Sequence, residues 1–313
     1  MSRESVTALI TGASGFAGRH LIAELEARTD WLLIGIGRSA VTAGQRTRVL
    51  SCDLMDADLV RRVTLRRRPD VVFHLAAESY VPRSLSDPAT TLTNNIVGQL
   101  NVLEACRANG LSPRILIVGS ADQYGLAGES EMPLVEDQPF RPLNPYAVSK
   151  IAQDMLGLQY ALSYDMHIVR VRPFNHFGPG QSDRFAISSF ARQIAEAELG
   201  RVEPVVLTGN LEARRDFLDV RDVARAYRLA LEHGVAGDVY NIAGGRAHRV
   251  GDLLEALVRD ASIPIEIRQD PARMRPSDTP VLVGNASKLR QATGWQPTIP
   301  IDVTLRDTLR DWR

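Results

Sequence analysis

The sequence contains only two cysteines, Cys52 and Cys106, and only two lysines, Lys150 and Lys288, among 313 residues. Two cysteines without paired spacing or a neighbouring ligand cluster argue against a disulfide framework and a zinc site. No apolar run approaches the roughly 18 residues of a membrane span, and the run at residues 6–10 is too short for a secretory signal. The sequence therefore predicts a cytoplasmic protein with no membrane partner.

The chain also lacks an excess of charge of either sign, because 37 Lys and Arg residues balance 37 Asp and Glu residues. A zero balance argues against binding of nucleic acid or another polyanion. The basic run Arg66-Arg67-Arg68 precedes a proline and is typical of the last turn of a solvated helix, where cations suit the helix dipole. Hydrophobic residues make up 44% of the chain, as in an ordinary protein with a packed core.

Short apolar runs alternate with amphipathic stretches in the first half of the sequence. The runs at residues 8–11, 32–37, 71–75, 115–119 and 167–171 each predict a buried strand, and helical patterns lie between them. This order predicts an α/β fold, namely a Rossmann-type doubly wound parallel sheet with helices on both faces.

A change of pattern after residue 172 predicts a smaller C-terminal lobe. Prolines and glycines cluster directly after that point. We therefore assign residues 1–172 to a Rossmann domain and residues 173–313 to the lobe. A strand-like run at residues 238–243 predicts that the chain rejoins the first domain over about residues 215–245.

A glycine-rich turn follows the first predicted strand and precedes the first predicted helix. Gly12 permits the tight turn, and Gly15 lets the backbone approach a pyrophosphate at the helix N-terminus. Gly18 lets the helix pack close to the strand. The turn, which includes Phe16, therefore predicts dinucleotide binding, and its glycine spacing resembles that of the short-chain dehydrogenase/reductase superfamily.

The end of the second strand usually decides between the two nicotinamide cofactors. Residues 34–39 contain no acid there, and Arg38 stands where a guanidinium can bind a 2′-phosphate. The sequence therefore predicts NADPH, with NADH as the alternative. The resemblance implies that Asp53 and Leu54 contact the adenine and that Ala76 lies beside the nicotinamide.

Tyr146 and Lys150 lie four residues apart, which places them on one face of a helix that starts after Asn144. A cation beside a phenol lowers the phenol pKa towards the working pH, so the pair predicts proton transfer by Tyr146. With seven tyrosines and two lysines, this spacing arises by chance in only about 5% of such chains. Ser120, after another predicted strand, supplies a hydroxyl for the reacting oxygen.

These motifs together resemble the extended short-chain dehydrogenases that act on nucleotide sugars, and the resemblance covers nearly the whole chain. Ser120, Tyr146 and Lys150 fall on the catalytic triad of that family, and Asn95 falls on its supporting asparagine. The resemblance implies an enzyme that transfers hydride from NADPH to a ketone while Tyr146 supplies the proton. It also implies a homodimer and a substrate-binding role for the lobe at residues 173–313.

Segments that begin at Arg172, Arg215 and Arg273 resemble members of the family that reduce carbon 4 of a keto sugar carried on GDP. Arginine forks suit a diphosphate, and an asparagine amide suits a phosphate or sugar oxygen. The candidate ligands of this GDP-sugar substrate are Ser79, Asp122, Asn175, Arg215 and Arg275.

The sequence predicts less specific roles for other polar residues of the second half of the chain. Glu212 is a candidate for reading the guanine base. His176 either reaches the sugar or is a structural histidine, and both readings stay open. Asp216, Asp219 and Asp222 are predicted to form local caps and salt bridges.

Two alternative functions share these motifs. One is a GDP-mannose 4,6-dehydratase, or another nucleotide-sugar dehydratase or epimerase, and the other is a non-catalytic Rossmann protein that senses the nicotinamide redox state. In such dehydratases a Glu removes the carbon 5 proton at the position of Asp122, which is one methylene too short to reach. Ala121 offers no proton to a leaving hydroxyl. The sequence therefore favours a reductase, and the intact triad disfavours a sensor.

Overall fold

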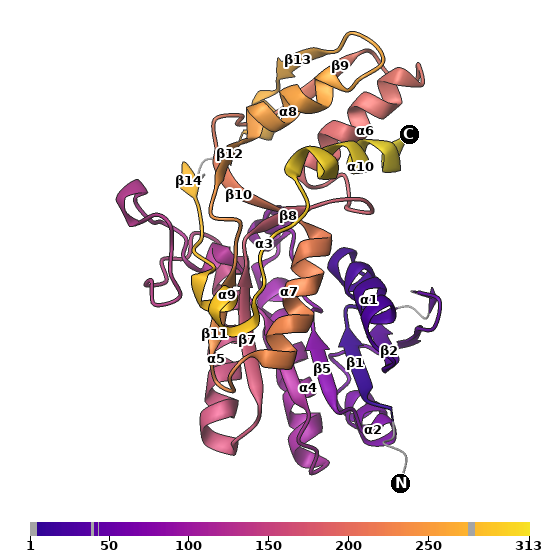
Figure 1. Ribbon diagram of the computed structural model, residues 1–313, viewed down its shortest axis with the longest axis vertical. Coiled ribbons are helices and arrows are strands. Elements are labelled where there is room, and N and C mark those ends of the chain that lie inside the picture. The colour runs from indigo at the N-terminus through magenta and orange to yellow at the C-terminus, as the bar shows by residue number, and fades with distance from the viewer. Residues whose placement is uncertain (1–4, 39–40, 43, 275–278) are drawn as a thin grey trace.

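The computed structural model of the chain describes residues 5–38, 41–42, 44–274 and 279–313. The candidate ligand Arg275 lies outside these residues. Figure 1 shows a body of sheet and helices in its lower part and a smaller lobe, which holds the C-terminus, above it.

One sheet of eight strands forms the centre of the larger body, in the order β11-β7-β6-β5-β1-β2-β4-β3. All neighbours in this sheet pair in parallel except β3, which is antiparallel to β4. The predicted Rossmann-type α/β fold is confirmed. The strands are β1 (Thr7–Thr11), β2 (Leu32–Gly37), β3 (Val41–Thr42), β4 (Arg48–Ser51), β5 (Val71–His74), β6 (Arg114–Val118), β7 (Ile168–Pro173) and β11 (Val239–Ile242).

Helices cover both faces of this sheet because consecutive strand residues point to opposite sides. Ile10 of β1 packs in one core cluster with Leu21 and Tyr227, which belong to α1 and α7. Leu9 packs in the other cluster with Val102 of α4. The helices of this body are α1 (Phe16–Arg28), α2 (Ala57–Arg67), α3 (Val81–Ser86), α4 (Pro88–Ala108), α5 (Pro145–Tyr164), α7 (Val220–His233) and α9 (Ser287–Thr293).

The smaller lobe is built around strand β10, which pairs with β8, β12 and β14, while β9 pairs with β13. Its helices α6, α8 and α10 enclose a third apolar cluster. The elements are β8 (Asn175–Phe177), α6 (Ala186–Glu198), β9 (Val205–Thr208), β10 (Arg214–Asp219), β12 (Ala247–Arg249), α8 (Val250–Arg259), β13 (Glu266–Gln269), β14 (Val281–Leu282) and α10 (Ile301–Trp312). The short 3₁₀ turns are η1 (Ala121–Gln123), η2 (Glu129–Glu131) and η3 (Pro271–Arg273).

Several local predictions can be compared with this fold. The run at 238–243 forms β11, which joins the large sheet beside β7, and the basic run 66–68 closes α2. The boundaries between the two domains stay a prediction. Both cysteines are buried free thiols. Across the ranges that the structure describes, none of the helices has the length and apolar character to cross a membrane.

Candidate active site

The glycine turn between β1 and α1 has a backbone that side chains would obstruct. Gly12 adopts a φ of +69°, and a Cβ there would lie 2.9 Å from the backbone nitrogen of Ala76. A Cβ on Gly18 would lie 2.3 Å from the carbonyl oxygen of Gly12. Gly15 is the N-cap of α1 and provides no side-chain cap, so the helix N-terminus presents backbone N–H groups to an anion. This turn fits the pyrophosphate of a dinucleotide.

The other predicted cofactor residues follow strands of the same sheet. Parallel strands bring their carboxyl ends to one edge, so the residues after β2, β4 and β5 lie at the edge where the glycine turn leaves β1. Arg38 is exposed directly after β2, and Asp53 is exposed after β4 next to the half-buried Leu54. The backbone N–H of Ala76, after β5, donates to Thr11 Oγ1 at 3.1 Å. These candidate cofactor residues therefore lie at the edge of the sheet where this fold class places a dinucleotide.

The three predicted catalytic residues meet between β6 and the first turns of α5. Ser120 follows β6 and caps η1, where its Oγ accepts the Asp122 N–H at 3.1 Å. Tyr146 and Lys150 lie in α5 and are buried. Burial and Asp122 raise the pKa of Tyr146, and the nearby Ser120 side chain partly offsets this rise. A carbonyl oxygen placed between the Ser120 and Tyr146 hydroxyls could take a hydrogen bond from both.

The pKa of Tyr146 shifts in the direction opposite to the one that the sequence predicts. Burial, followed by the negative charge of Asp122, raises the pKa of Tyr146 instead of lowering it. Lys150 donates its Nζ to the Val118 carbonyl oxygen at 2.8 Å, and this nitrogen lies 6.0 Å from the centroid of the Tyr146 ring. Burial also lowers the pKa of Lys150 to about 7, which weakens its charge near neutral pH. In the chain by itself the pKa of Tyr146 is thus raised, which is opposite to the direction that the spacing predicts.

Asn95 connects the catalytic helix to the segment that carries Ser79. Its Nδ2 donates to Ser149 Oγ at 2.9 Å, and Ser149 Oγ donates to the Tyr146 carbonyl oxygen at 2.7 Å. The Asn95 side chain also binds both backbone groups of Glu78, at 2.7 and 3.1 Å. Ser79 is the next residue and is exposed. The asparagine thus holds two parts of the candidate site in place.

His74 lies buried at the end of β5, two residues before Ala76. Its Nδ1 is 2.9 Å from Thr11 Oγ1, and its Nε2 is 3.4 Å from Gln153 Nε2. Burial and the nearby Lys150 charge lower the pKa of His74 to about 3, so the ring is neutral at physiological pH. Its contacts are those of a structural residue.

A buried ionic network below Ser120 was not predicted from the sequence. Gln123 Oε1 accepts the Ser120 N–H at 2.8 Å, and its Nε2 donates to Asp154 Oδ2 at 3.0 Å. Asp154 pairs with Arg170 and also with Arg172, whose Nε lies 2.7 Å from Oδ2. These contacts fix the turn that carries Ser120 to α5. In the sequence, the members of this network are visible only as polar residues within segments of apolar periodicity.

The candidate substrate ligands come from the lobe and from the turn after β6. Asn175 starts β8 and is paired in register with Phe217 of β10. Arg215 lies in β10, and its Nη1 donates to the carbonyl oxygens of Arg214 and Pro280 at 3.0 and 3.4 Å. Asp122 is half-buried. Strand pairing thus brings Asn175 and Arg215 into neighbouring strands.

His176 and Glu212 have partners within the chain. The His176 ring stacks on Phe16 of the glycine turn, with centroids 6.1 Å apart and an interplanar angle of 7°. This contact joins the lobe to the cofactor turn. Glu212 binds Arg249 through both carboxylate oxygens, at 2.5 and 3.1 Å. A guanine base would have to compete with Arg249 for that carboxylate.

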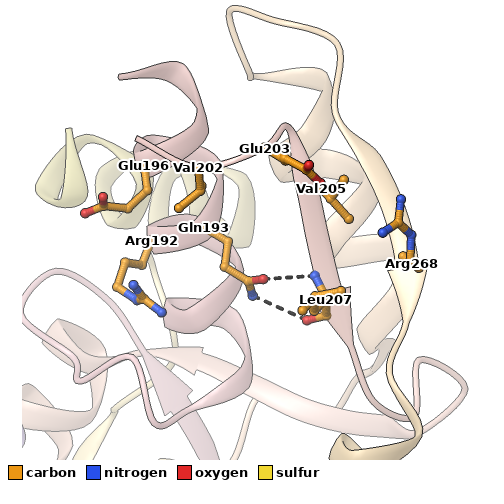
Figure 2. A pocket seen from close by; sticks show the side chains of 8 residues that line it. All are labelled: Arg192, Gln193, Glu196, Val202, Glu203, Val205, Leu207 and Arg268. Carbon is orange, nitrogen blue, oxygen red and sulfur yellow. Dashed lines mark hydrogen bonds between the residues drawn. The ribbon is translucent and has the colours of Figure 1, made fainter. Parts of the chain in front are cut away.

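A separate hollow of about 370 Å³ lies between α6, β9 and β13 (Figure 2). Gln193 of α6 borders it and binds both the N–H and the carbonyl of Leu207 in β9, at 2.9 and 3.3 Å. The predicted site residues do not line this hollow. It is lined by Arg192, Gln193, Glu196, Val202, Glu203, Val205, Leu207 and Arg268.

Comparison with known proteins gives consistent matches over almost the whole chain. Residues 9–308 match the family model described as GDP-mannose 4,6 dehydratase. The chain is 41% identical over 304 residues to GDP-6-deoxy-D-mannose reductase from Pseudomonas aeruginosa. This alignment covers 97% of this chain and 96% of that protein. It is 29% identical to GDP-mannose 4,6-dehydratase from Yersinia enterocolitica, over 80% of this chain and 74% of that protein.

A solved structure agrees with these sequence matches. The structure of RMD from Pseudomonas aeruginosa complexed with NADPH is similar with a TM-score of 0.88 and 40% identity, over 98% of this chain and 99% of that chain. The resemblance to nucleotide-sugar enzymes that the motifs indicated is confirmed.

Proposed function

Because the chain belongs to the GDP-mannose 4,6 dehydratase family, we propose that it is a reductase within that family. It uses NADPH to reduce the carbon 4 ketone of GDP-4-dehydro-6-deoxy-D-mannose and forms GDP-D-rhamnose. The observation that carries the proposal is the likeness to the Pseudomonas reductase along nearly the entire chain. The turn after β6 supports it, because Asp122 and Ala121 lack the reach and the proton that a dehydratase needs.

Tyr146 and Ser120 carry the proton chemistry of this reaction. When bound, NADPH supplies the hydride. Tyr146 gives its hydroxyl proton to the sugar oxygen as that oxygen gains negative charge, and Ser120 donates a hydrogen bond to the same oxygen. The raised pKa of Tyr146 keeps the phenol protonated at neutral pH, which is the form that a proton donor requires. One hydride and one proton complete the reduction.

The edge of the large sheet holds the cofactor in this proposal. The turn of Gly12, Gly15 and Gly18, with Phe16 beside it, would hold the pyrophosphate. Arg38 binds the 2′-phosphate with its guanidinium fork. Further contacts come from Asp53, Leu54 and Ala76 to the dinucleotide and from Lys150 to the nicotinamide ribose.

The GDP-sugar lies between the sheet and the lobe. Arg215 and Arg275 bind its diphosphate, and Asn175 binds a phosphate or sugar oxygen. Ser79 and Asp122 face the sugar. The two hydroxyls of Ser120 and Tyr146 then meet its carbon 4 oxygen.

Two incubations of the pure protein test the proposed function. One contains GDP-mannose alone, and the other contains GDP-4-dehydro-6-deoxy-D-mannose with NADPH. NADPH absorbance and sugar analysis are followed in both. We expect NADPH oxidation and GDP-rhamnose only in the second incubation. Efficient conversion of GDP-mannose to the keto sugar without added reductant would instead identify a dehydratase.

A homodimer in the cytoplasm is also part of the proposal. Val148, Met155 and Leu162 follow one another at seven-residue intervals on α5, which places them on one helix face, and all three are exposed. A second copy of the chain would cover this face. Met155→Glu should shift the particle towards a monomer in light scattering, whereas an unchanged dimer would place the interface elsewhere. Two buried free thiols suit a reducing compartment.

A further inference from the structure

Asp216 of β10 is a buried carboxylate that the proposed chemistry does not use. Its Oδ1 accepts the N–H of Gly244 at 2.8 Å. Its Oδ2 accepts the N–H of Gly245 at 2.8 Å and of Gly284 at 3.2 Å. In the part of the chain that the structure describes, no cationic side chain forms an ion pair with it. The predicted role as a local cap or salt bridge is therefore wrong for this residue, because its partners are distant backbone groups.

The three N–H groups belong to two loops that are distant in the sequence. Gly244 and Gly245 follow β11, which is part of the large sheet, whereas Gly284 follows β14 of the lobe. A Cβ on Gly284 would lie 2.4 Å from the Phe174 ring, so that loop has no room for a side chain. The carboxylate thus connects strand β10 of the lobe to the loop that follows strand β11 of the large sheet.

Asp216 of strand β10 is also close to two proposed substrate ligands. Its chain neighbour on one side is Arg215. Its neighbour on the other side is Phe217, which is paired in register with Asn175 of β8. A movement of β10 at Asp216 would therefore displace both ligands.

We propose that Asp216 is a positioning residue for the nucleotide sugar, because its three backbone bonds fix Arg215 and Asn175 relative to the large sheet. The inference rests on the proposed function. Burial raises the pKa of Asp216 to about 6, so the carboxylate is still ionised at neutral pH and binds the N–H groups as a charged acceptor.

Asp216→Asn tests this role because it keeps the shape but turns an NH₂ group towards at least one N–H donor. We expect the Kd of GDP-mannose, measured by calorimetry, and the KM of the keto sugar to rise about tenfold or more. The kcat should stay within about threefold and the Kd of NADPH within about twofold, because the groups at the reacting oxygen and the cofactor edge are untouched. A merely structural residue would not separate KM from kcat.

Asp222→Asn is a matched control. Asp222 is a buried carboxylate of α7 that accepts the N–H groups of Thr298 and Ile299, both at 2.9 Å. This variant should lose stability and keep the wild-type Kd for GDP-mannose. Unchanged GDP-mannose binding by Asp216→Asn, or an equal loss of NADPH binding, overturns the inference.

A second variant covers the case in which Asp216→Asn does not fold. In Gly244→Ala the new Cβ would lie 3.0 Å from Asp216 Oδ1 and push the carboxylate aside. We expect the KM to rise a few-fold, and an unchanged KM in the folded variant also overturns the inference. Wild-type protein that fails to oxidise NADPH with the keto sugar would refute the proposed function instead, and calorimetry with GDP-mannose would still test Asp216.

Discussion

Tyr146→Phe removes the proposed proton donor and little else. The phenyl ring keeps the packing of the buried tyrosine, and Ser120 Oγ keeps its bond from the Asp122 N–H. Lys150 keeps its bond to Val118. The cost in folding free energy should therefore be about 1 kcal/mol, the worth of one hydrogen bond. General acid catalysis contributes about 10²–10⁴-fold, or about 3–5 kcal/mol of the barrier, so kcat should fall by at least about 100-fold.

The assay follows NADPH absorbance with GDP-4-dehydro-6-deoxy-D-mannose, and fluorescence titration gives the Kd of NADPH. We expect that Kd to change less than about twofold. Tyr160→Phe is the matched control, because Tyr160 is a buried tyrosine of the same helix whose hydroxyl binds Glu104 at 2.5 Å, outside the candidate site. It should keep the wild-type kcat. A Tyr146→Phe variant with nearly full turnover, or with equal losses in kcat and NADPH affinity, would refute this role.

Three other variants test separate parts of the site. Arg38→Ala should reduce the preference for NADPH over NADH in kcat/KM by about tenfold or more, and a wild-type enzyme that prefers NADH contradicts the assignment. Lys150→Met should weaken NADPH binding, because it removes the proposed contact to the nicotinamide ribose. It should also raise the free energy of unfolding at pH 7 by about 2–4 kcal/mol in denaturant titrations without cofactor, because burial lowers the pKa of the lysine from 10.5 to about 7. This gain should shrink as the pH rises from about 7 to about 10.5, where the unfolded lysine also loses its proton, and a gain that is constant with pH contradicts the reasoning. Gln123→Met should lower kcat about tenfold with little change in KM, because Ser120 loses its backbone partner, and an equal rise in KM would point to a general disturbance.

The local parts of the site could be predicted from the sequence. The glycine turn depends on backbone freedom at a junction between strand and helix, and both elements are visible in the apolar periodicity. Tyr146 and Lys150 share a helix face because residues four apart do so in any α-helix. Arg38 and Asp53 follow strands whose carboxyl ends meet in every parallel sheet. In each case the relevant geometry spans only a few residues or follows from the fold class.

The remaining parts depend on partners that are distant in the sequence. Asn95 meets Ser149 across two helices, and Asp216 meets Gly244 and Gly284 across three segments. Such contacts depend on strand order and register, which no local pattern encodes. The direction of the Tyr146 pKa shift also depends on tertiary structure, because burial and the neighbouring Asp122 raise it. The sequence by itself thus determined the fold class and the chemical groups of the candidate site, whereas tertiary packing decided their protonation and the buried contacts that hold them in position.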